Sequence, residues 1–370
     1  MKIGILTQPL RTNYGGLLQA YALQTVLQRL GHDVTILNRC YPKTHESLLS
    51  KILNIKNIVL GKNAICYDKK KNVFVEENTS RFIDNNYKLS APFYTSESLR
   101  EYVISNNFNA IIVGSDQVWR PRYSPNIFNY FLDFTEGTDI KRYSYAASYG
   151  VDIWEFNQQE SDICSRLAQS FNGITVREAS AVELCEIYLK VKAEHVLDPS
   201  LLLSSSDYTA LLTGKKTINK KGIFTYILDA GDEKKHIIEN AKKTTGKDSF
   251  TCMPKLKFNY KNAKEDLSGC QFPAVEQWIQ SFVDAEMVIT DSFHGTAFSI
   301  IFNKPFWVIG NERRGNTRME SLLEMFGLKD RMVNESSINT IDWNTPIDWE
   351  KVNDIKKKWQ MKSMYFFTNL

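Results

Sequence analysis

One of the five histidines, His294, lies between two apolar stretches whose patterns predict a strand at 287–290 and a helix at 296–302. Asp291 or Ser292 can cap that helix, and Gly295 allows another chain segment or a ligand to approach closely. A histidine at a helix N-terminus can donate to a phosphate or serve as an acid or base. The structural alternative is a capped turn with a hydrogen-bonded histidine. The strand–turn–helix context favours the functional interpretation.

Arginines follow two other predicted strands. Arg177 comes directly after the strand predicted at 174–176, and its planar guanidinium suits a carboxylate or a phosphate. An ion pair with Glu178 is the structural alternative. Three more arginines follow the strand predicted at 306–309, namely Arg313, Arg314 and Arg318. They form a candidate anion-binding loop, or else an exposed basic loop.

A paired-glycine segment, Asn13-Tyr14-Gly15-Gly16, separates the first predicted strand from the first predicted helix. Glycines let the backbone approach a ligand, and a helix N-terminus favours an anion. The spacing is not the G-x-G-x-x-G of dinucleotide-binding proteins, and Asn38-Arg39 follows the second strand where an acidic residue would bind a ribose. A tight turn without a ligand is the structural alternative.

Two further segments carry groups that suit a sugar. After a buried strand come Asp116 and Gln117, which can hydrogen-bond sugar hydroxyls, and Trp119, which can stack on a sugar face. The small residues around Ser148 leave room for a ligand. A capped turn with a core tryptophan, and close packing of small residues, explain these segments about equally well.

The sequence predicts no metal site and no cofactor. It has no H-E-x-x-H motif and no Cys₂His₂ cluster, and its six cysteines are scattered without a C-x-x-C pair. We therefore expect free thiols in a reducing cytoplasm. The anion-favouring groups instead point to a small phosphorylated ligand.

These residues are positioned by two successive α/β units. A strand at 2–7, a helix at 17–30 and a strand at 34–37 form a βαβ start, which predicts a parallel sheet. A second series begins at 223, after the polar stretch 204–221. We therefore expect an α/β fold of two Rossmann-like domains facing a central cleft, which is where such sheets bind ligands.

Length and net charge limit the number of domains and the classes of function that the chain can have. With 370 residues, the chain suits two domains, expected at 1–204 and 205–345, with a tail helix at 346–370 that packs back on the first domain. Lys and Arg number 46 against 42 Asp and Glu, and a net charge of +4 is too small to indicate nucleic-acid binding. The apolar runs fall far short of the ~20 residues that a membrane helix needs, and the N-terminus does not match a signal peptide.

Taken together, the motifs resemble the polysaccharide pyruvyl transferase family. The matching stretches occur in the family's order: Asn13–Gly16 with Leu18-Gln19-Ala20, Gly114–Trp119, Ser144–Gly150, Val176-Arg177-Glu178, Val196–Pro199, Asp291–Gly295 and Asn316–Arg318. The resemblance implies a fold like that of the GT-B glycosyltransferases, with the acceptor on the N-terminal domain and the donor on the C-terminal one. It implies phosphoenolpyruvate as donor and a cyclic pyruvate ketal as product. The acceptor would be a sugar of a surface polysaccharide or of its lipid-linked precursor, reached from the cytoplasm or the inner membrane face.

The resemblance implies that Arg177 and His294 engage the donor, and the chemistry of the reaction suggests roles for the other residues. His294 would be a donor ligand or the proton donor, and Asp116 would be a candidate base for the sugar hydroxyl. The donor would be bound by Arg177, Arg313, Arg314, Arg318, Ser292 and Gly295. The acceptor would be bound by Asn13, Tyr14, Gly15, Gly16, Gln117, Trp119 and Ser148. Some members carry an arginine where this chain has Ser292, and an arginine of the 313–318 loop would replace its charge. The alternatives are a nucleotide-sugar glycosyltransferase of the same architecture and a non-catalytic carbohydrate- or anion-binding protein.

Overall fold

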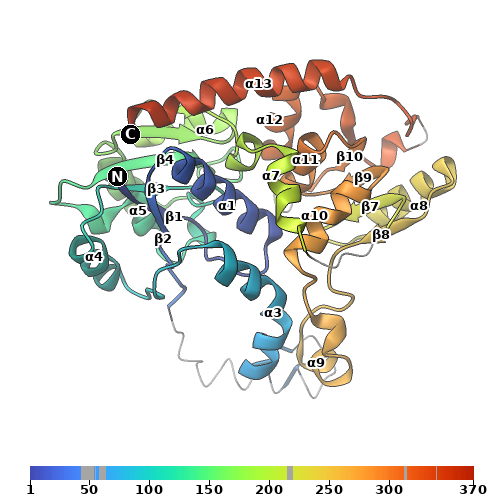
Figure 1. Cartoon of the computed structure of the whole chain (residues 1–370), viewed down its shortest axis with the longest axis horizontal. Coiled ribbons are helices and arrows are strands. Elements are labelled where there is room, and N and C mark those ends of the chain that lie inside the picture. The colour runs from blue at the N-terminus through green and yellow to red at the C-terminus, as the bar shows by residue number, and fades with distance from the viewer. Residues whose placement is uncertain (43–53, 55, 58–63, 215–219, 312–314, 339) are drawn as a thin grey trace.

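The computed structural model describes the chain except for residues 43–53, 55, 58–63, 215–219, 312–314 and 339. Two α/β halves lie side by side, each built on its own parallel sheet (Figure 1). The α/β class expected from the sequence, with two parallel sheets, is confirmed.

The N-terminal half contains a six-stranded parallel sheet in the order β2-β1-β3-β4-β5-β6. Its strands are β1 (Lys2–Leu6), β2 (Asp33–Ile36), β3 (Ala110–Val113), β4 (Lys141–Ala147), β5 (Gly173–Val176) and β6 (Glu194–His195). Its helices are α1 (Tyr14–Arg29), α3 (Lys69–Asn86), α4 (Ser96–Ser105), α5 (Gln158–Ala168) and α6 (Ala179–Leu184). The central strands are apolar on both faces because helices cover both sides of the sheet.

The C-terminal half contains a five-stranded parallel sheet in the order β11-β10-β9-β7-β8. Its strands are β7 (Ile223–Tyr226), β8 (Ser249–Thr251), β9 (Met287–Thr290), β10 (Phe306–Ile309) and β11 (Met332–Val333). Its helices are α8 (Asp232–Thr245), α9 (Tyr260–Glu265), α10 (Val275–Asp284), α11 (Phe293–Ile301) and α12 (Thr317–Phe326). Helix α7 (Ser205–Thr209) lies between the last strand of the first sheet and the first strand of the second.

Helix α13 (Trp349–Tyr365) runs along the top of both halves in Figure 1. Near its end, Ser363 Oγ accepts a hydrogen bond from the backbone N–H of Leu197 at 2.9 Å. The following Phe367 ring packs on Tyr145 of β4, with ring centroids 4.7 Å apart. The end of the chain is thereby attached to the N-terminal sheet.

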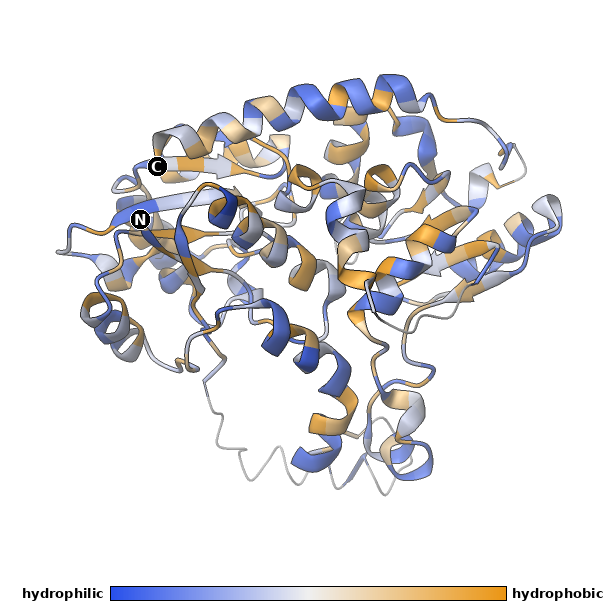
Figure 2. Ribbon diagram, in the orientation of Figure 1, coloured by the Kyte–Doolittle hydropathy of each residue, from blue (hydrophilic) through white to orange (hydrophobic). Residues whose placement is uncertain are grey.

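A shared hydrophobic core fixes the two halves relative to each other. Tyr14, in the first turn of α1, stacks on Trp278 of α10 with ring centroids 5.7 Å apart. The same core cluster includes Ile5 of the first sheet and Val288 of the second. Apolar residues therefore lie along both sheets and at their junction (Figure 2). This packing places the N-terminus of α1 against the C-terminal half.

The start of α1 corrects one sequence prediction. Asn13–Gly16 was predicted to be a turn before a helix beginning at Leu17, but the helix already begins at Tyr14. Both glycines are therefore in the first helical turn. The sequence pattern misses this because glycine is a poor helix former, and here tertiary contacts override that preference.

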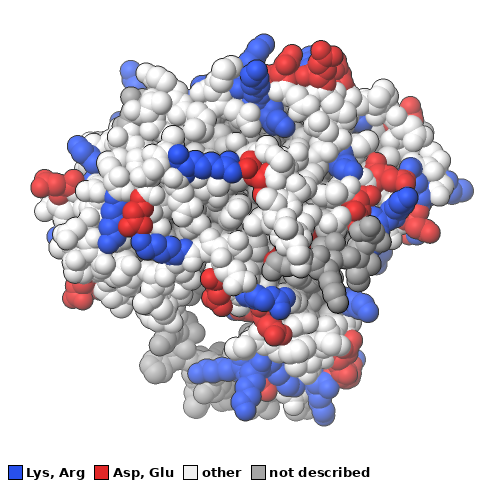
Figure 3. All heavy atoms as spheres, in the orientation of Figure 1, with Lys and Arg blue, Asp and Glu red and all other residues white. Residues whose placement is uncertain are grey.

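Three further features concern membrane-spanning helices, metal sites and surface charge. None of the helices in the described part of the chain is long and apolar enough to cross a membrane. Among the same residues, no group of three or more His, Cys, Asp or Glu side chains could hold a metal ion. On the face shown in Figure 3, basic and acidic side chains are interspersed.

Candidate active site

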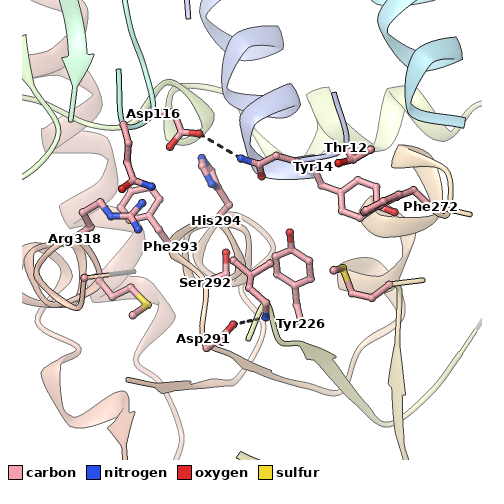
Figure 4. A pocket seen from close by; sticks show the side chains of 16 residues that line it. Thr12, Tyr14, Asp116, Tyr226, Phe272, Asp291, Ser292, Phe293, His294 and Arg318 are labelled. Carbon is pink, nitrogen blue, oxygen red and sulfur yellow. Dashed lines mark hydrogen bonds between the residues drawn. The ribbon is translucent and has the colours of Figure 1, made fainter. Parts of the chain in front are cut away.

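A cavity of about 240 Å³ lies between the C-terminal edges of the two sheets. Its walls come from both halves of the chain, as Figure 4 shows. The lining residues are Thr12, Asn13, Tyr14, Asp116, Gln117, Tyr226, Leu228, Met253, Phe272, Asp291, Ser292, Phe293, His294, Gly315, Arg318 and Met319. This is the edge where parallel α/β sheets bind ligands, because the loops that leave their strands converge there.

Two helix N-termini meet at this cavity. Helix α1 has 16 residues, no acidic residue in its first turn, and an N-cap residue, Asn13, whose side chain makes no capping hydrogen bond. Helix α11 begins beside it and is capped by Ser292 Oγ, which accepts from the Gly295 N–H at 3.4 Å. The first N–H groups of a helix lack intrahelical partners and carry partial positive charge. Together the two helices favour an anion between them.

His294 lies in the first turn of α11 and is 5% exposed. Its Nε2 atom is buried without a hydrogen-bond partner among the described residues. Burial lowers the pKa of His294, while the nearby carboxylates of Asp198 and Asp116 act to raise it. The ring is thus held in a site where its charge depends closely on neighbouring charges.

Asp116 approaches His294 from the N-terminal half (Figure 4). It follows β3 in a left-handed backbone conformation, with φ of 74°, so the loop turns sharply at this residue. Asn13 Nδ2 donates to its Oδ2 at 3.4 Å, and Arg177 Nη2 lies 3.5 Å from its Oδ1. The carboxylate therefore links the start of α1 to a buried arginine.

Arg177 lies behind the cavity wall and is 3% exposed. Its Nη1 donates to Asp198 Oδ2 at 3.0 Å, and its guanidinium stacks 4.3 Å from the centre of the Phe293 ring. Burial alone would lower the pKa of Arg177, but Asp198, Asp116 and Glu178 raise it. The guanidinium therefore stays charged, and the Phe293 ring separates it from the cavity.

Arg318 is the arginine that lines the cavity directly. It lies in the first turn of α12 and is largely buried. Burial, together with the charge of Arg177, lowers its pKa to about 10. Arg318 is thus still a cation at neutral pH, with less solvent competing for its donors.

Asp291 also lines the cavity, but its carboxylate oxygens accept hydrogen bonds from residues of the C-terminal half. Oδ1 accepts from the Leu228 N–H at 2.7 Å. Oδ2 accepts from Lys234 Nζ at 2.6 Å and from Asn311 Nδ2 at 2.9 Å. These bonds fix the loop after β7 beneath the cavity.

The structure brings together about half of the residues that the sequence singled out. Those that line the cavity are Asn13, Tyr14, Asp116, Gln117, Ser292, His294 and Arg318. Arg177 lies immediately behind Phe293. Arg313 and Arg314 lie outside the described residues.

Two residues that were expected to bind the acceptor sugar do not line the cavity. Trp119 is 0% exposed, stacks on Phe131 and donates from Nε1 to the Tyr130 carbonyl at 2.9 Å. A sugar therefore cannot reach its ring, and the prediction that it stacks on the acceptor is wrong. Ser148 is also buried, and its Oγ donates to Glu178 Oε1 at 2.9 Å.

The predicted glycines act through packing rather than by lining the cavity. A Cβ at Gly15 would lie 2.2 Å from the His294 ring, and one at Gly295 would lie 2.1 Å from Thr290 Oγ1. A Cβ at Gly16 would lie 2.9 Å from Asn13 Nδ2. Each glycine thus allows a close approach, but the group that approaches is a side chain of the protein and not a ligand.

The sequence patterns do not indicate the apolar end of the cavity. Tyr226 and Phe272 lie there beside Tyr14 (Figure 4), and Met253 lines the same cavity. Tyr226 ends β7, so it lies at the sheet edge where the other site residues are found. Phe272 lies in a loop without periodicity, so no local pattern indicates it. Asp198 lies in the Val196–Pro199 stretch, and the sequence alone indicates no role for it.

Comparisons with known proteins agree with this architecture. The model of a family described as polysaccharide pyruvyl transferase matches residues 13–313. A search of the curated proteins found no match.

Among solved structures, UDP-GlcNAc 2-epimerase from Methanocaldococcus jannaschii is 13% identical with a TM-score of 0.54, and the alignment covers 100% of both chains. UGT89C1 from Arabidopsis thaliana, complexed with UDP-L-rhamnose, is 8% identical with a TM-score of 0.51, covering 99% of this chain and 98% of that one. At these identities the likeness concerns the fold alone, and it confirms the GT-B-like architecture.

Proposed function

This chain belongs to the polysaccharide pyruvyl transferase family, and we propose that it transfers the pyruvyl group of phosphoenolpyruvate to a sugar of a surface polysaccharide or its lipid-linked precursor. The product would be a cyclic pyruvate ketal. The observation that carries the proposal is the convergence of anion-binding groups on one small cavity. Two helix N-termini, His294 and Arg318 face it, and Arg177 lies just behind.

The donor's chemistry suits this set of groups. Phosphoenolpyruvate carries a carboxylate and a phosphate on a three-carbon frame, so it needs several cationic groups close together. Arg318 and the N-terminus of α1 suit the phosphate, since both present N–H donors. Arg177 Nε and Nη2 make no hydrogen bond among the described residues, but they lie behind Phe293, 3.9 Å from Glu178 Oε2 and 3.5 Å from Asp116 Oδ1.

The size of the cavity favours this donor over a nucleotide sugar. Its volume of about 240 Å³ is below the roughly 300–1,000 Å³ of sites that enclose drug-sized ligands. A three-carbon phosphate fits such a space and leaves the open side for an acceptor.

The reaction needs one proton donor and one proton acceptor. His294 would give a proton to the methylene carbon of phosphoenolpyruvate, which becomes a methyl group and leaves the adjacent carbon electrophilic. A sugar hydroxyl attacks that carbon as Asp116 accepts the hydroxyl proton. A second hydroxyl of the same sugar then displaces inorganic phosphate, which leaves with the second hydroxyl's proton. Arg318 and the helix N-termini would stabilise the charge on the departing phosphate.

The apolar end of the cavity suits the acceptor. Met253 and Phe272 are partly exposed there, next to Tyr14 and Tyr226. A sugar presents an apolar face of C–H groups that packs on aromatic rings, while its hydroxyls need polar partners. We place the sugar on Phe272, with its reacting hydroxyls directed toward Asp116.

A direct binding test separates the two donor classes. Isothermal titration of the purified protein with phosphoenolpyruvate should give saturable binding, and UDP-GlcNAc should give none at the same concentration. A His294→Gln, Arg318→Met double variant should lose the phosphoenolpyruvate signal. Binding of UDP-GlcNAc alone would replace the proposal with a nucleotide-sugar glycosyltransferase.

A further inference from the structure

A buried carboxylate, Asp198, joins the two charged groups that this site depends on. It follows β6 and caps the short 3₁₀ helix Pro199–Leu202. Its Oδ2 atom accepts from Arg177 Nη1 at 3.0 Å and lies 3.8 Å from His294 Nε2. Asp198 does not line the cavity, so it has no direct access to a substrate there.

Four hydrogen bonds hold the Asp198 carboxylate in place. Oδ1 accepts from the Ser200 N–H at 2.9 Å and from Ser200 Oγ at 2.7 Å. Oδ2 accepts from Ser115 Oγ at 3.1 Å as well as from Arg177. Burial alone would raise the pKa of Asp198, but His294, Arg177 and the Ser200 bonds hold it below its usual value. The group is therefore a fixed negative charge.

Charges face His294 from several elements. Asp198 lies in the segment after β6, Asp116 follows β3, Arg177 follows β5 and Arg318 begins α12. Helix α1 packs on the ring through Gly15, and its Tyr14 stays neutral because burial raises the pKa of the phenol well above its usual value. Two cations thus oppose a proton on His294 and two carboxylates favour it. Without Asp198, the cations would outnumber the carboxylates.

We propose that Asp198 is a positioning residue that keeps His294 able to hold a proton on Nε2 and holds Arg177 stacked against Phe293. The role rests on the proposed function, because it matters only if His294 donates a proton to the donor. Asp198 acts through space on His294, since 3.8 Å is too long for a hydrogen bond. It acts on Arg177 by direct contact. The Asp198 carboxylate thereby acts on both the proposed acid, His294, and the buried cation, Arg177.

The charge effect can be measured without any substrate. With only five histidines in the chain, the ¹³Cε1 resonance of His294 can be assigned by its loss in His294→Gln and followed against pH. In Asp198→Asn the titration midpoint of His294 should fall by roughly one to three pH units, as expected when an opposite charge within about 4–6 Å is removed. Asp207→Asn is the matched control, because Asp207 pairs with Arg29 on the surface. It should leave the midpoint unchanged.

A second variant tests the proposal independently if Asp198→Asn does not fold. Ser200→Ala removes the Oγ bond to Oδ1 but leaves the carboxylate charge, so the His294 midpoint should stay or rise slightly. A fall of the midpoint in Ser200→Ala, or an unchanged midpoint in folded Asp198→Asn, would overturn the proposal.

Kinetics then link the charge to the reaction. In pyruvyl transfer, the high-pH limb of the kcat profile should move to lower pH in Asp198→Asn, because the acid form of His294 is lost earlier. A purely structural role would lower activity equally at every pH and would contradict the proposal. If wild type transfers no pyruvyl group while its His294 midpoint still depends on Asp198, the proposed function fails and the charge relationship stands.

Discussion

Gly15 of α1 lies directly against His294 of α11, so closely that a Cβ at position 15 would be 2.2 Å from the imidazole Nδ1. The two residues come from opposite halves of the chain and from the first turns of two helices. The contact therefore joins the two helix N-termini that define the cavity. It also explains a glycine at a helical position where alanine would be the better helix former.

Replacing Gly15 with alanine should misplace His294. The helix itself would gain about 1 kcal/mol from the substitution, so a loss of function would report the clash. We expect kcat for pyruvyl transfer to fall by about 10- to 100-fold, as for roughly 1 Å displacements of catalytic groups. Steady-state kinetics would measure this. Gly231→Ala is the control, because a Cβ there meets nothing within 4 Å. Full activity in Gly15→Ala would argue against a positioned His294.

Arg318→Met should weaken donor binding specifically. Losing a charge-assisted hydrogen bond costs about 1.5–3 kcal/mol, so the donor KM should rise about 10- to 100-fold while the acceptor KM changes little. Arg331→Met offers a contrast, since Arg331 is also buried but donates to the carbonyls of Thr345 and Pro346. That variant should lower the unfolding midpoint and leave the donor KM unchanged. Equal donor KM values for Arg318→Met and wild type would remove Arg318 from the donor site.

Donor binding should be coupled to proton uptake. Burial lowers the pKa of His294 in the empty enzyme, and an anionic donor beside the ring raises it. Affinity is therefore full below the lowered pKa of the empty enzyme and declines as pH rises toward the higher pKa of the complex. Titrations at about pH 7.5 in buffers of different ionisation enthalpy should show net uptake in wild type but not in His294→Gln. Uptake of equal size in both would assign the proton to another group.

The aromatic end of the cavity should affect the acceptor only. Phe272→Ala should raise the KM for a sugar acceptor by about fivefold, since a lost aromatic contact of this kind costs of the order of 1 kcal/mol, and the donor KM should stay constant. Trp119→Phe is the counterpart for the residue that proved to be buried. It should lower the free energy of unfolding by roughly 1–3 kcal/mol without changing the acceptor KM. A changed acceptor KM only in Trp119→Phe would reverse these two assignments.

The sequence located the edge of each sheet that carries the site, since His294, Arg177 and Asp116 each follow a predicted strand. That inference works because all strands in a parallel sheet end at the same edge. It did not give the direction of each side chain beyond the strand. Trp119 lies only three positions after Asp116, yet the turn at Asp116 sends the indole into the core, and such a turn depends on tertiary contacts.

Residues that act through long-range packing were the hardest to predict. Phe272 reaches the cavity from a loop whose path is set by contacts such as the Tyr14 hydroxyl bond to the Pro273 carbonyl at 2.8 Å. Asp198 gains its importance only when Arg177 and His294 come together from different elements. Gly15 looked like a ligand-approach glycine, and only the opposing helix shows that its neighbour is His294.

The most direct test is to identify the product formed in deuterated water. The enzyme, phosphoenolpyruvate and a panel of sugars would be incubated in D₂O, and the products analysed by mass spectrometry and NMR. We predict release of phosphate and a sugar that gains one pyruvate less one water, with one deuterium in the ketal methyl group. His294→Gln should form this product at least about 100-fold more slowly. A wild-type enzyme that yields no ketal with any sugar of the panel, or a ketal methyl group without deuterium, would contradict the account.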